Sequence, residues 1–217
     1  MSAVEIKICG ITNVADAEAA LDAGADMLGI NFYEASPRRI TLERAQEIAE
    51  AVAGRVKLVG VFVNMNVTSV LQIARTVPLD VVQLHGSESP EDCATVVAEF
   101  AVIRALKVDN TFSAARAAEF SEYSGLLLDT ACASHGGSGR SFDWKSIDWA
   151  RVREAAPLAK LFLAGGLHAG NVAEAIAAAH PDVVDVCSGV EREKGIKSVR
   201  RMREFVAAVR AAESEEQ

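Results

Sequence analysis

The chain has 217 residues, half of them hydrophobic, and a formal net charge of −8. This length can bury one sizeable core, so we expect a single domain over 1–217. The acidic balance argues against nucleic acid as a partner, because a phosphate backbone requires a basic face. No apolar run is long enough to span a membrane, so we expect no membrane association, and the N-terminus lacks the features of a signal peptide.

Short β-branched runs alternate with alanine-rich stretches along the chain. The apolar runs predict strands at 4–9, 27–32, 57–63, 81–85, 102–107, 125–129, 161–165 and 183–187. The stretches between and after them predict helices at 14–23, 41–53, 68–76, 90–99, 111–119, 145–155, 170–179 and 197–212. Local signals agree, since Asn13 can cap the first helix, Gly24 can end it and Pro90 suits a first helical turn.

Strand–helix alternation with short connections predicts parallel strands joined by crossover helices. Eight such units in a chain of this length favour an α/β fold of the closed (β/α)8 TIM-barrel type over an unusually wide open sheet. In such a barrel the active site lies at the C-terminal ends of the strands. The residues predicted there are Cys9-Gly10, Asn31-Phe32, Val63-Asn64, Gln83 to Gly86, Lys107, Asp129-Thr130, Gly165-Gly166 and Ser188-Gly189.

Four cysteines, at 9, 93, 132 and 187, are far apart and include no C-x-x-C pair. This spacing is unlike that of zinc sites or disulfide frameworks, so we expect no metal and a reducing, cytoplasmic location.

The first predicted strand carries Lys7 and Cys9 on one face, because side chains alternate along a strand. A lysine next to a cysteine on an inward face is unusual for an apolar core and indicates a polar pocket. A nearby cation favours the thiolate. Asp185 on the last strand lies beside them once the barrel closes, so we expect Asp185 and Lys7 to form a polar layer beneath Cys9. The alternative is that Cys9 is an inert, buried small hydrophobe.

Glycines after the seventh and eighth strands, Gly165-Gly166 and Ser188-Gly189, favour a phosphate site. Glycine lets backbone N–H groups approach an anion, and this barrel commonly binds phosphate in these two loops. The alternative is that they are only tight turns. A third glycine-rich loop, Gly136 to Arg140, could close over the ligand or could be a flexible surface loop.

Three further side chains are candidates at the same end of the barrel. Asp129 ends an apolar strand, where a carboxyl group must be solvated, paired or protonated, so it is either a general acid or a cap or ion-pair partner. Arg38 could hold a substrate carboxylate in a two-point contact or could be an exposed surface arginine. His85 could be an acid or base, or a hydrogen-bonded loop residue.

Taken together, these segments resemble the phosphoribosylanthranilate isomerase family from Ile6 to about Lys197. The similar segments are 7–12 (KICGIT), 36–40 (SPRRI), 61–64 (VFVN), 83–86 (QLHG), 127–130 (LLDT), 136–144 (GGSGRSFDW), 164–167 (AGGL) and 185–191 (DVCSGVE). No single segment is decisive, but their joint occurrence in order is highly specific.

The resemblance implies an Amadori rearrangement in tryptophan biosynthesis, with a phosphorylated substrate and no cofactor. It implies that Asp129 is the general acid, Cys9 the general base and Arg38 the contact to the anthranilate carboxylate. It also implies that His85 contacts substrate and that Gly139, Gly166, Ser188 and Gly189 lie in the substrate-binding, phosphate-holding part of the pocket. Family members occur as monomers and homodimers.

The chain departs from the family pattern at Cys187, where serine or asparagine is more usual, and in the segment 194–198. Two alternatives stay open. Another phosphate-binding barrel enzyme would be expected to place different acids or bases at the strand ends. A non-catalytic barrel that binds a phosphorylated metabolite would have no use for Cys9 and Asp129 together.

Overall fold

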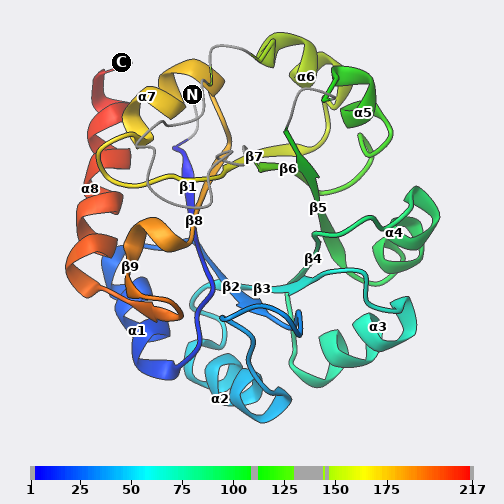
Figure 1. The fold of residues 1–217 in the computed structure, drawn as a ribbon, viewed down its shortest axis with the longest axis vertical. Coiled ribbons are helices and arrows are strands. Elements are labelled where there is room, and N and C mark those ends of the chain that lie inside the picture. Colours follow the sequence, from blue (N-terminus) through cyan, green and yellow to red (C-terminus); the bar gives the residue numbers. More distant parts are fainter. Residues whose placement is uncertain (1–2, 109–111, 130–143, 145–146, 216–217) are drawn as a thin grey trace.

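The computed structural model describes residues 3–108, 112–129, 144 and 147–215. Eight parallel strands form a closed barrel in chain order, and the last strand pairs with the first. Figure 1 shows the helices as a ring around these strands. The predicted (β/α)8 barrel is therefore confirmed. Within the described ranges, no helix is long and apolar enough to cross a membrane.

Every predicted strand and helix is present. The strands are β1 (Glu5–Cys9), β2 (Met27–Asn31), β3 (Lys57–Phe62), β4 (Val81–Leu84), β5 (Ala101–Lys107), β6 (Gly125–Asp129), β7 (Lys160–Ala164) and β8 (Val183–Val186). The helices are α1 (Val14–Ala23), α2 (Leu42–Val52), α3 (Val67–Thr76), α4 (Pro90–Val97), α5 (Ala114–Ala118), α6 (Trp149–Ala155), α7 (Val172–Ala179) and α8 (Val199–Glu215).

The helix boundaries follow their capping residues. Asn13 accepts a hydrogen bond from the N–H of Asp16, and Gly24 ends α1 in the left-handed conformation with φ of 100°. Ser89 and Asp92 form a capping box at the first turn of α4, which begins at Pro90. The sixth helix begins at 149 rather than at the predicted 145, because Asp148 caps it by accepting from the N–H of Arg151.

Apolar side chains fill both sides of the sheet. A small cluster occupies the barrel interior, and a much larger one lies between the strands and the surrounding helices. On β1, Ile6 and Ile8 belong to the outer cluster, whereas Lys7 points inward. Because parallel strands in this fold are covered by helices, their outward residues must be apolar. The inward face is the one that can carry polar chemistry.

The chain after β8 differs from the prediction. Residues 197–212 were expected to be helical, but Lys197 lies in a strand and α8 begins at Val199. A short 3-10 turn, η2 (Ser188–Val190), leads into an antiparallel hairpin of β9 (Glu191–Glu193) and β10 (Ile196–Lys197). Gly195 has φ of 82°, which permits the tight turn between these two strands.

A buried ion pair supports the loop after β4. Arg104 on β5 is 1% exposed and lies 3.2 Å from the carboxylate of Glu88. Its guanidinium also donates to the carbonyls of Leu84 and Gly86 at 2.9 and 3.0 Å. Glu88 in turn accepts from the N–H groups of Asn64 and Gly86 at 2.8 Å each. The pair therefore fixes the segment that carries His85.

Replacing Arg104 with methionine should lower the free energy of unfolding by about 3–5 kcal/mol, because Glu88 would remain buried without its partner. Arg116 provides a matched control, since it also stacks on Phe120 but pairs with Glu119 at the surface. Arg116→Met should cost less than about 1 kcal/mol. Urea unfolding of both variants measures the difference, and equal losses would contradict the assigned role of the buried pair.

Candidate active site

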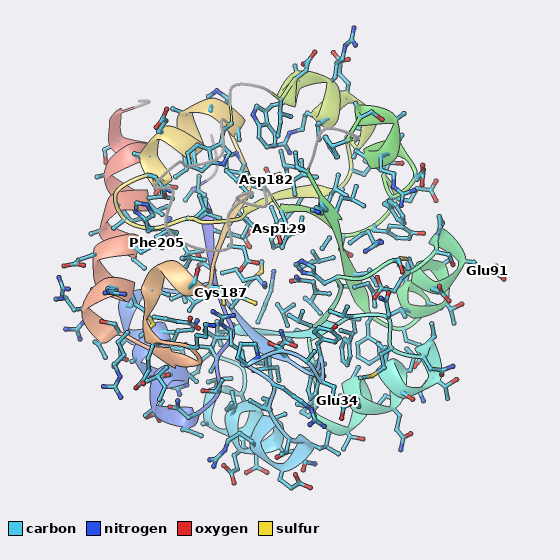
Figure 2. All side chains as sticks on the ribbon, in the orientation of Figure 1. Glu34, Glu91, Asp129, Asp182, Cys187 and Phe205 are labelled. Carbon is cyan, nitrogen blue, oxygen red and sulfur yellow. The ribbon has the colours of Figure 1, made fainter. Side chains whose placement is uncertain are left out.

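A pocket of about 280 Å³ opens at the C-terminal ends of the strands. It collects most of the residues that the sequence singled out. Its lining includes Cys9, Gly10, Arg38, Gln83, His85, Asp129, Gly165, Gly166, Asp185, Cys187 and Ser188. Figure 2 shows Asp129 and Cys187 inside the ring of strands, whereas Glu91 lies on the outer helices. Gly189 follows Ser188 without lining the pocket, and Gly139 lies outside the described residues.

The floor of this pocket is an ion pair between the first and last strands. Lys7 and Asp185 face each other in the register of β1 and β8, and Lys7 Nζ lies 2.9 Å from Asp185 Oδ2. The two side chains are 0% and 7% exposed. The predicted polar layer beneath Cys9 is thus confirmed.

Burial and charge act in opposite directions on this pair. Burial raises the pKa of Asp185 to about 6, against the lowering effect of the Lys7 charge. Burial alone would lower the pKa of Lys7, but the charges of Asp185 and Cys9 hold it above its usual value. Lys7 therefore stays cationic directly below the sulfur of Cys9.

Cys9 and Cys187 are neighbouring thiols at the ends of β1 and β8. A hydrogen bond from Cys187 is the largest cause that lowers the pKa of Cys9; burial opposes it, and the charges of Lys7 and Lys197 reinforce it. The same hydrogen bond, together with burial, raises the pKa of Cys187. This hydrogen bond therefore favours the negative charge on Cys9 and the proton on Cys187.

The space for the Cys9 sulfur comes from a glycine on the neighbouring strand. Gly29 on β2 is the register partner of Cys9, and a Cβ at this position would lie 2.7 Å from the sulfur. Any larger residue would therefore displace the thiolate. Sequence analysis did not identify Gly29 as a site residue, because Cys9, which needs the space, lies on another strand.

His85 lies between Gln83 and Asp129. The Nε2 atom of the Gln83 amide is 2.7 Å from Nδ1 of His85, and His85 Nε2 is 3.4 Å from Asp129 Oδ2. The ring of His85 is therefore held between the Gln83 amide and the Asp129 carboxyl group. The Asp129 side chain is 35% exposed in the open pocket. Gln83 was missed as a site residue, although alternation along β4 places it on the face of His85.

Arg38 does not stand free in the pocket. Its Nε and Nη2 atoms both donate to the carboxylate of Glu191 at 2.7 Å. Glu191 also accepts from Lys197 Nζ at 3.1 Å, and the Lys197 side chain is fully buried. Sequence analysis assigned no role to Glu191 or Lys197, because nothing local predicts the contact between Arg38 and Glu191 across 153 positions.

The two glycine-rich loops meet at the rim of the pocket. Gly165 and Gly166 have φ of 95° and 67°, which residues with a side chain rarely adopt. A Cβ on Gly189 would lie 2.0 Å from the carbonyl oxygen of Leu167. Glycine at 189 therefore allows the loop after β8 to pack directly on the loop after β7.

Alkylation of Cys9 by iodoacetamide should show a half-maximal rate well below pH 8.5, the usual region for a thiol. Cys187→Ala should move this midpoint upward, because the strongest hydrogen bond to the thiolate is lost. Cys187→Ser should leave it closer to the starting value, because a hydroxyl can donate the same bond. The rates are measured by mass spectrometry across pH.

A background with serine at positions 93 and 132 removes the other thiols from this measurement. Burial raises the pKa of Cys93 to about 11, so its thiol should contribute little in any case. A midpoint that is the same with alanine or cysteine at 187 would contradict the proposed coupling.

Comparison with known proteins agrees with this geometry. The family model for N-(5'phosphoribosyl)anthranilate (PRA) isomerase matches residues 6–208. The chain is 47% identical to the N-(5'-phosphoribosyl)anthranilate isomerase of Acidithiobacillus ferrooxidans, over 97% of this chain and 99% of that one. It is 45% identical to the enzyme of Pseudomonas paraeruginosa, over 97% of each chain.

Solved structures give the same result. The phosphoribosyl anthranilate isomerase of Thermotoga maritima superposes with a TM-score of 0.88 at 39% identity, covering 96% of this chain and 99% of that chain. A phosphoribosyl anthranilate isomerase in complex with reduced 1-(o-carboxyphenylamino)-1-deoxyribulose 5-phosphate superposes with a TM-score of 0.85 at 37% identity, with the same coverage. The chain therefore belongs to the phosphoribosylanthranilate isomerase family.

Proposed function

We propose that the chain converts N-(5-phosphoribosyl)anthranilate into 1-(2-carboxyphenylamino)-1-deoxyribulose 5-phosphate, an Amadori rearrangement in tryptophan biosynthesis. Family membership over nearly the whole chain supports the reaction. The observation that carries the assignment is that Cys9, whose pKa is lowered by Cys187 and Lys7, and the carboxyl group of Asp129 line one pocket. A barrel that only bound a phosphorylated metabolite would need neither group.

The two groups have complementary tasks. Asp129 gives a proton to the ring oxygen of the ribose, and the ring opens to an iminium ion. The iminium acidifies the neighbouring C2 proton, which the Cys9 thiolate removes. The resulting enolamine then becomes the ketone. The acid must begin protonated and the base deprotonated, and such opposite demands on two side chains are typical of acid–base catalysis.

The rest of the pocket orients the substrate. Arg38 binds the anthranilate carboxylate, and His85, beside Asp129, contacts the substrate near the reacting end. Gly166, Ser188 and Gly189 belong to the two loops that hold the phosphate, where glycines let backbone N–H groups approach the anion. The same role is proposed for Gly139. No cofactor or metal takes part in these steps.

We further propose a cytoplasmic location. Cys9, Cys93 and Cys187 are free thiols, and a catalytic thiolate beside a second thiol is best preserved in a reducing compartment.

Replacing Cys9 with alanine or Asp129 with asparagine should each lower kcat/KM by about 10²- to 10⁴-fold, the usual contribution of a general acid or base. The wild-type pH profile should be bell-shaped. Activity should fall at low pH as Cys9 becomes protonated, and this limb should lie below the usual thiol range because its pKa is lowered. Steady-state kinetics on freshly generated substrate measure both effects, and near-normal turnover in either variant would defeat the assignment.

Growth rescue tests the reaction itself. A bacterial strain lacking the isomerase step should grow without tryptophan when it carries the wild-type chain, and should fail to grow with the Cys9→Ala/Asp129→Asn double variant. Failure of the folded wild-type chain to rescue would favour one of the alternative barrel functions.

A further inference from the structure

The guanidinium of Arg38 is held on two sides. Glu191 takes its Nε and Nη2 atoms in two parallel hydrogen bonds of 2.7 Å. Gly10 lies against its stem, since a Cβ on Gly10 would be 2.6 Å from Arg38 Cδ. A planar guanidinium fixed along one edge can rotate little, because two parallel bonds define its plane. Among the residues that the structure describes, none is hydrogen-bonded to Nη1, so the Nη1–Nη2 edge can face a ligand in the pocket.

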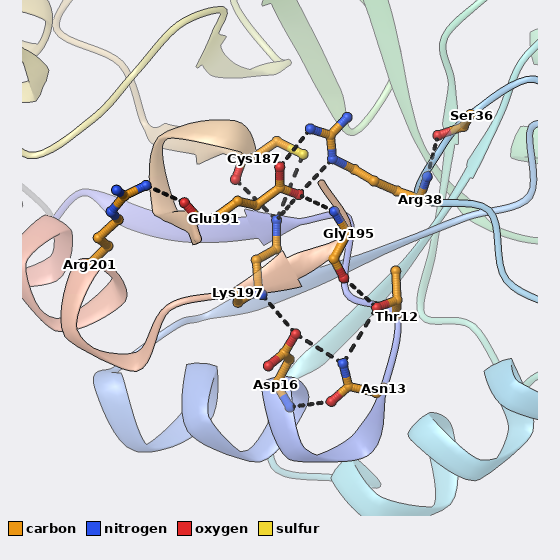
Figure 3. A network of polar contacts seen from close by, with 10 residues as sticks. All are labelled: Thr12, Asn13, Asp16, Ser36, Arg38, Cys187, Glu191, Gly195, Lys197 and Arg201. Carbon is orange, nitrogen blue, oxygen red and sulfur yellow. Dashed lines mark hydrogen bonds and ion pairs between the residues drawn. The ribbon is translucent and has the colours of Figure 1, made fainter. Parts of the chain in front are cut away.

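Glu191 is itself fixed by buried donors, as Figure 3 shows. Its side chain is 5% exposed, and Oε1 accepts from Lys197 Nζ at 3.1 Å and from the N–H of Gly195 at 3.3 Å. Burial alone would raise the pKa of Glu191, but the bonds from Arg38 and Lys197 hold it below its usual value. These donors therefore favour the charged carboxylate and fix its position behind Arg38.

The hairpin that carries Glu191 is tied to the start of the barrel. The N–H of Lys197 donates to Asp16 at the first turn of α1 at 2.9 Å, and Thr12 donates to the carbonyl of Gly195 at 2.5 Å. Lys197 Nζ also donates to the carbonyl of Cys187 at 3.0 Å. These contacts place the hairpin on the same framework as Cys9.

Arg38, Glu191 and Lys197 form a cluster with an excess of positive charge, which can attract a substrate carboxylate. Arg38 and Lys197 are cations and Glu191 is the one anion between them. Lys197 therefore offsets the negative charge that would otherwise repel a carboxylate approaching Arg38. The cluster therefore has a net charge of one positive unit. This charge faces the pocket at the Nη1–Nη2 edge of Arg38.

We propose that Glu191 is a positioning residue for substrate recognition: it occupies the Nε–Nη2 edge of Arg38 so that the substrate carboxylate binds end-on, at Nη1 and Nη2. This proposal rests on the proposed role of Arg38 as the carboxylate contact. It assigns specificity for the aromatic acid to the network of Arg38, Glu191 and Lys197 rather than to Arg38 alone.

Two ligands separate positioning from general structural support. One is reduced 1-(2-carboxyphenylamino)-1-deoxyribulose 5-phosphate, and the other is the same compound without the ring carboxylate. Wild-type protein should bind the first more tightly, and Arg38→Met should abolish this preference. Glu191→Gln, which places an amide N–H₂ against the guanidinium, should weaken binding of the carboxylate ligand by about tenfold or more. Its affinity for the ligand without the carboxylate should change by less than about twofold.

Kinetics and a neighbouring residue provide the controls. Glu191→Gln should raise KM with little change in kcat, because the carboxylate contact is the same in the ground and transition states. Glu193→Gln alters a carboxylate on the same strand whose side chain is 67% exposed and pairs with the neighbouring Arg192, and it should change neither ligand's affinity. If Glu191→Gln does not fold, Glu191→Asp keeps the charge but withdraws it from the guanidinium, and it should lose part of the preference.

The outcomes are distinguishable. Equal weakening of both ligands by Glu191→Gln, or full retention of the preference in Glu191→Gln or Glu191→Asp, would overturn the role of Glu191 alone. A wild-type protein that isomerises the substrate but binds both ligands equally would overturn the Arg38 contact and this proposal together. A wild-type protein that prefers the carboxylate ligand but has no isomerase activity would leave the recognition network supported and the proposed reaction refuted.

Discussion

The ion pair between Lys7 and Asp185 is the constraint on which the site depends. It joins the first and last strands at the seam where the barrel closes, so its geometry exists only in the folded chain. Burying two charges is costly and is offset only by good pairing. Here the pair lies beneath Cys9 and keeps a cation under its sulfur. The Lys7–Asp185 contact therefore helps to close the barrel and also lowers the pKa of Cys9 through the charge of Lys7.

Around this pair, charged groups are arranged in layers from the floor of the pocket to its rim. Above Lys7 and Asp185 lie the two thiols, and the proton of Cys187 stabilises the thiolate of Cys9. Lys197 donates a hydrogen bond to the carbonyl of Cys187 in the thiol layer. It donates another to Glu191, which holds Arg38 at the rim. One buried lysine thus connects the proposed base to the proposed carboxylate site.

The acid side of the pocket is built differently. Asp129 ends an apolar strand, lies 3.4 Å from His85 and has a side chain that is 35% exposed. His85 is oriented by Gln83, and its loop is supported by Arg104 through the backbone. The base is therefore set in a buried electrostatic network, whereas the acid stands at an accessible rim. This asymmetry matches the proposed reaction, since the acid must meet a bulky sugar ring and the base only a single proton.

The sequence by itself determined the barrel, its strand and helix order and the identity of most pocket residues. Periodicity and capping are local properties, so Asn13, Gly24 and the strand that ends at Asp129 could be read directly. Alternation also placed Lys7 and Asp185 on inward faces, and barrel closure then made them neighbours. Only the tertiary structure decided the partners of Arg38 and the purpose of Gly29. Those contacts join segments far apart in the chain, and neither local propensity nor spacing encodes which distant side chain will fill a given position.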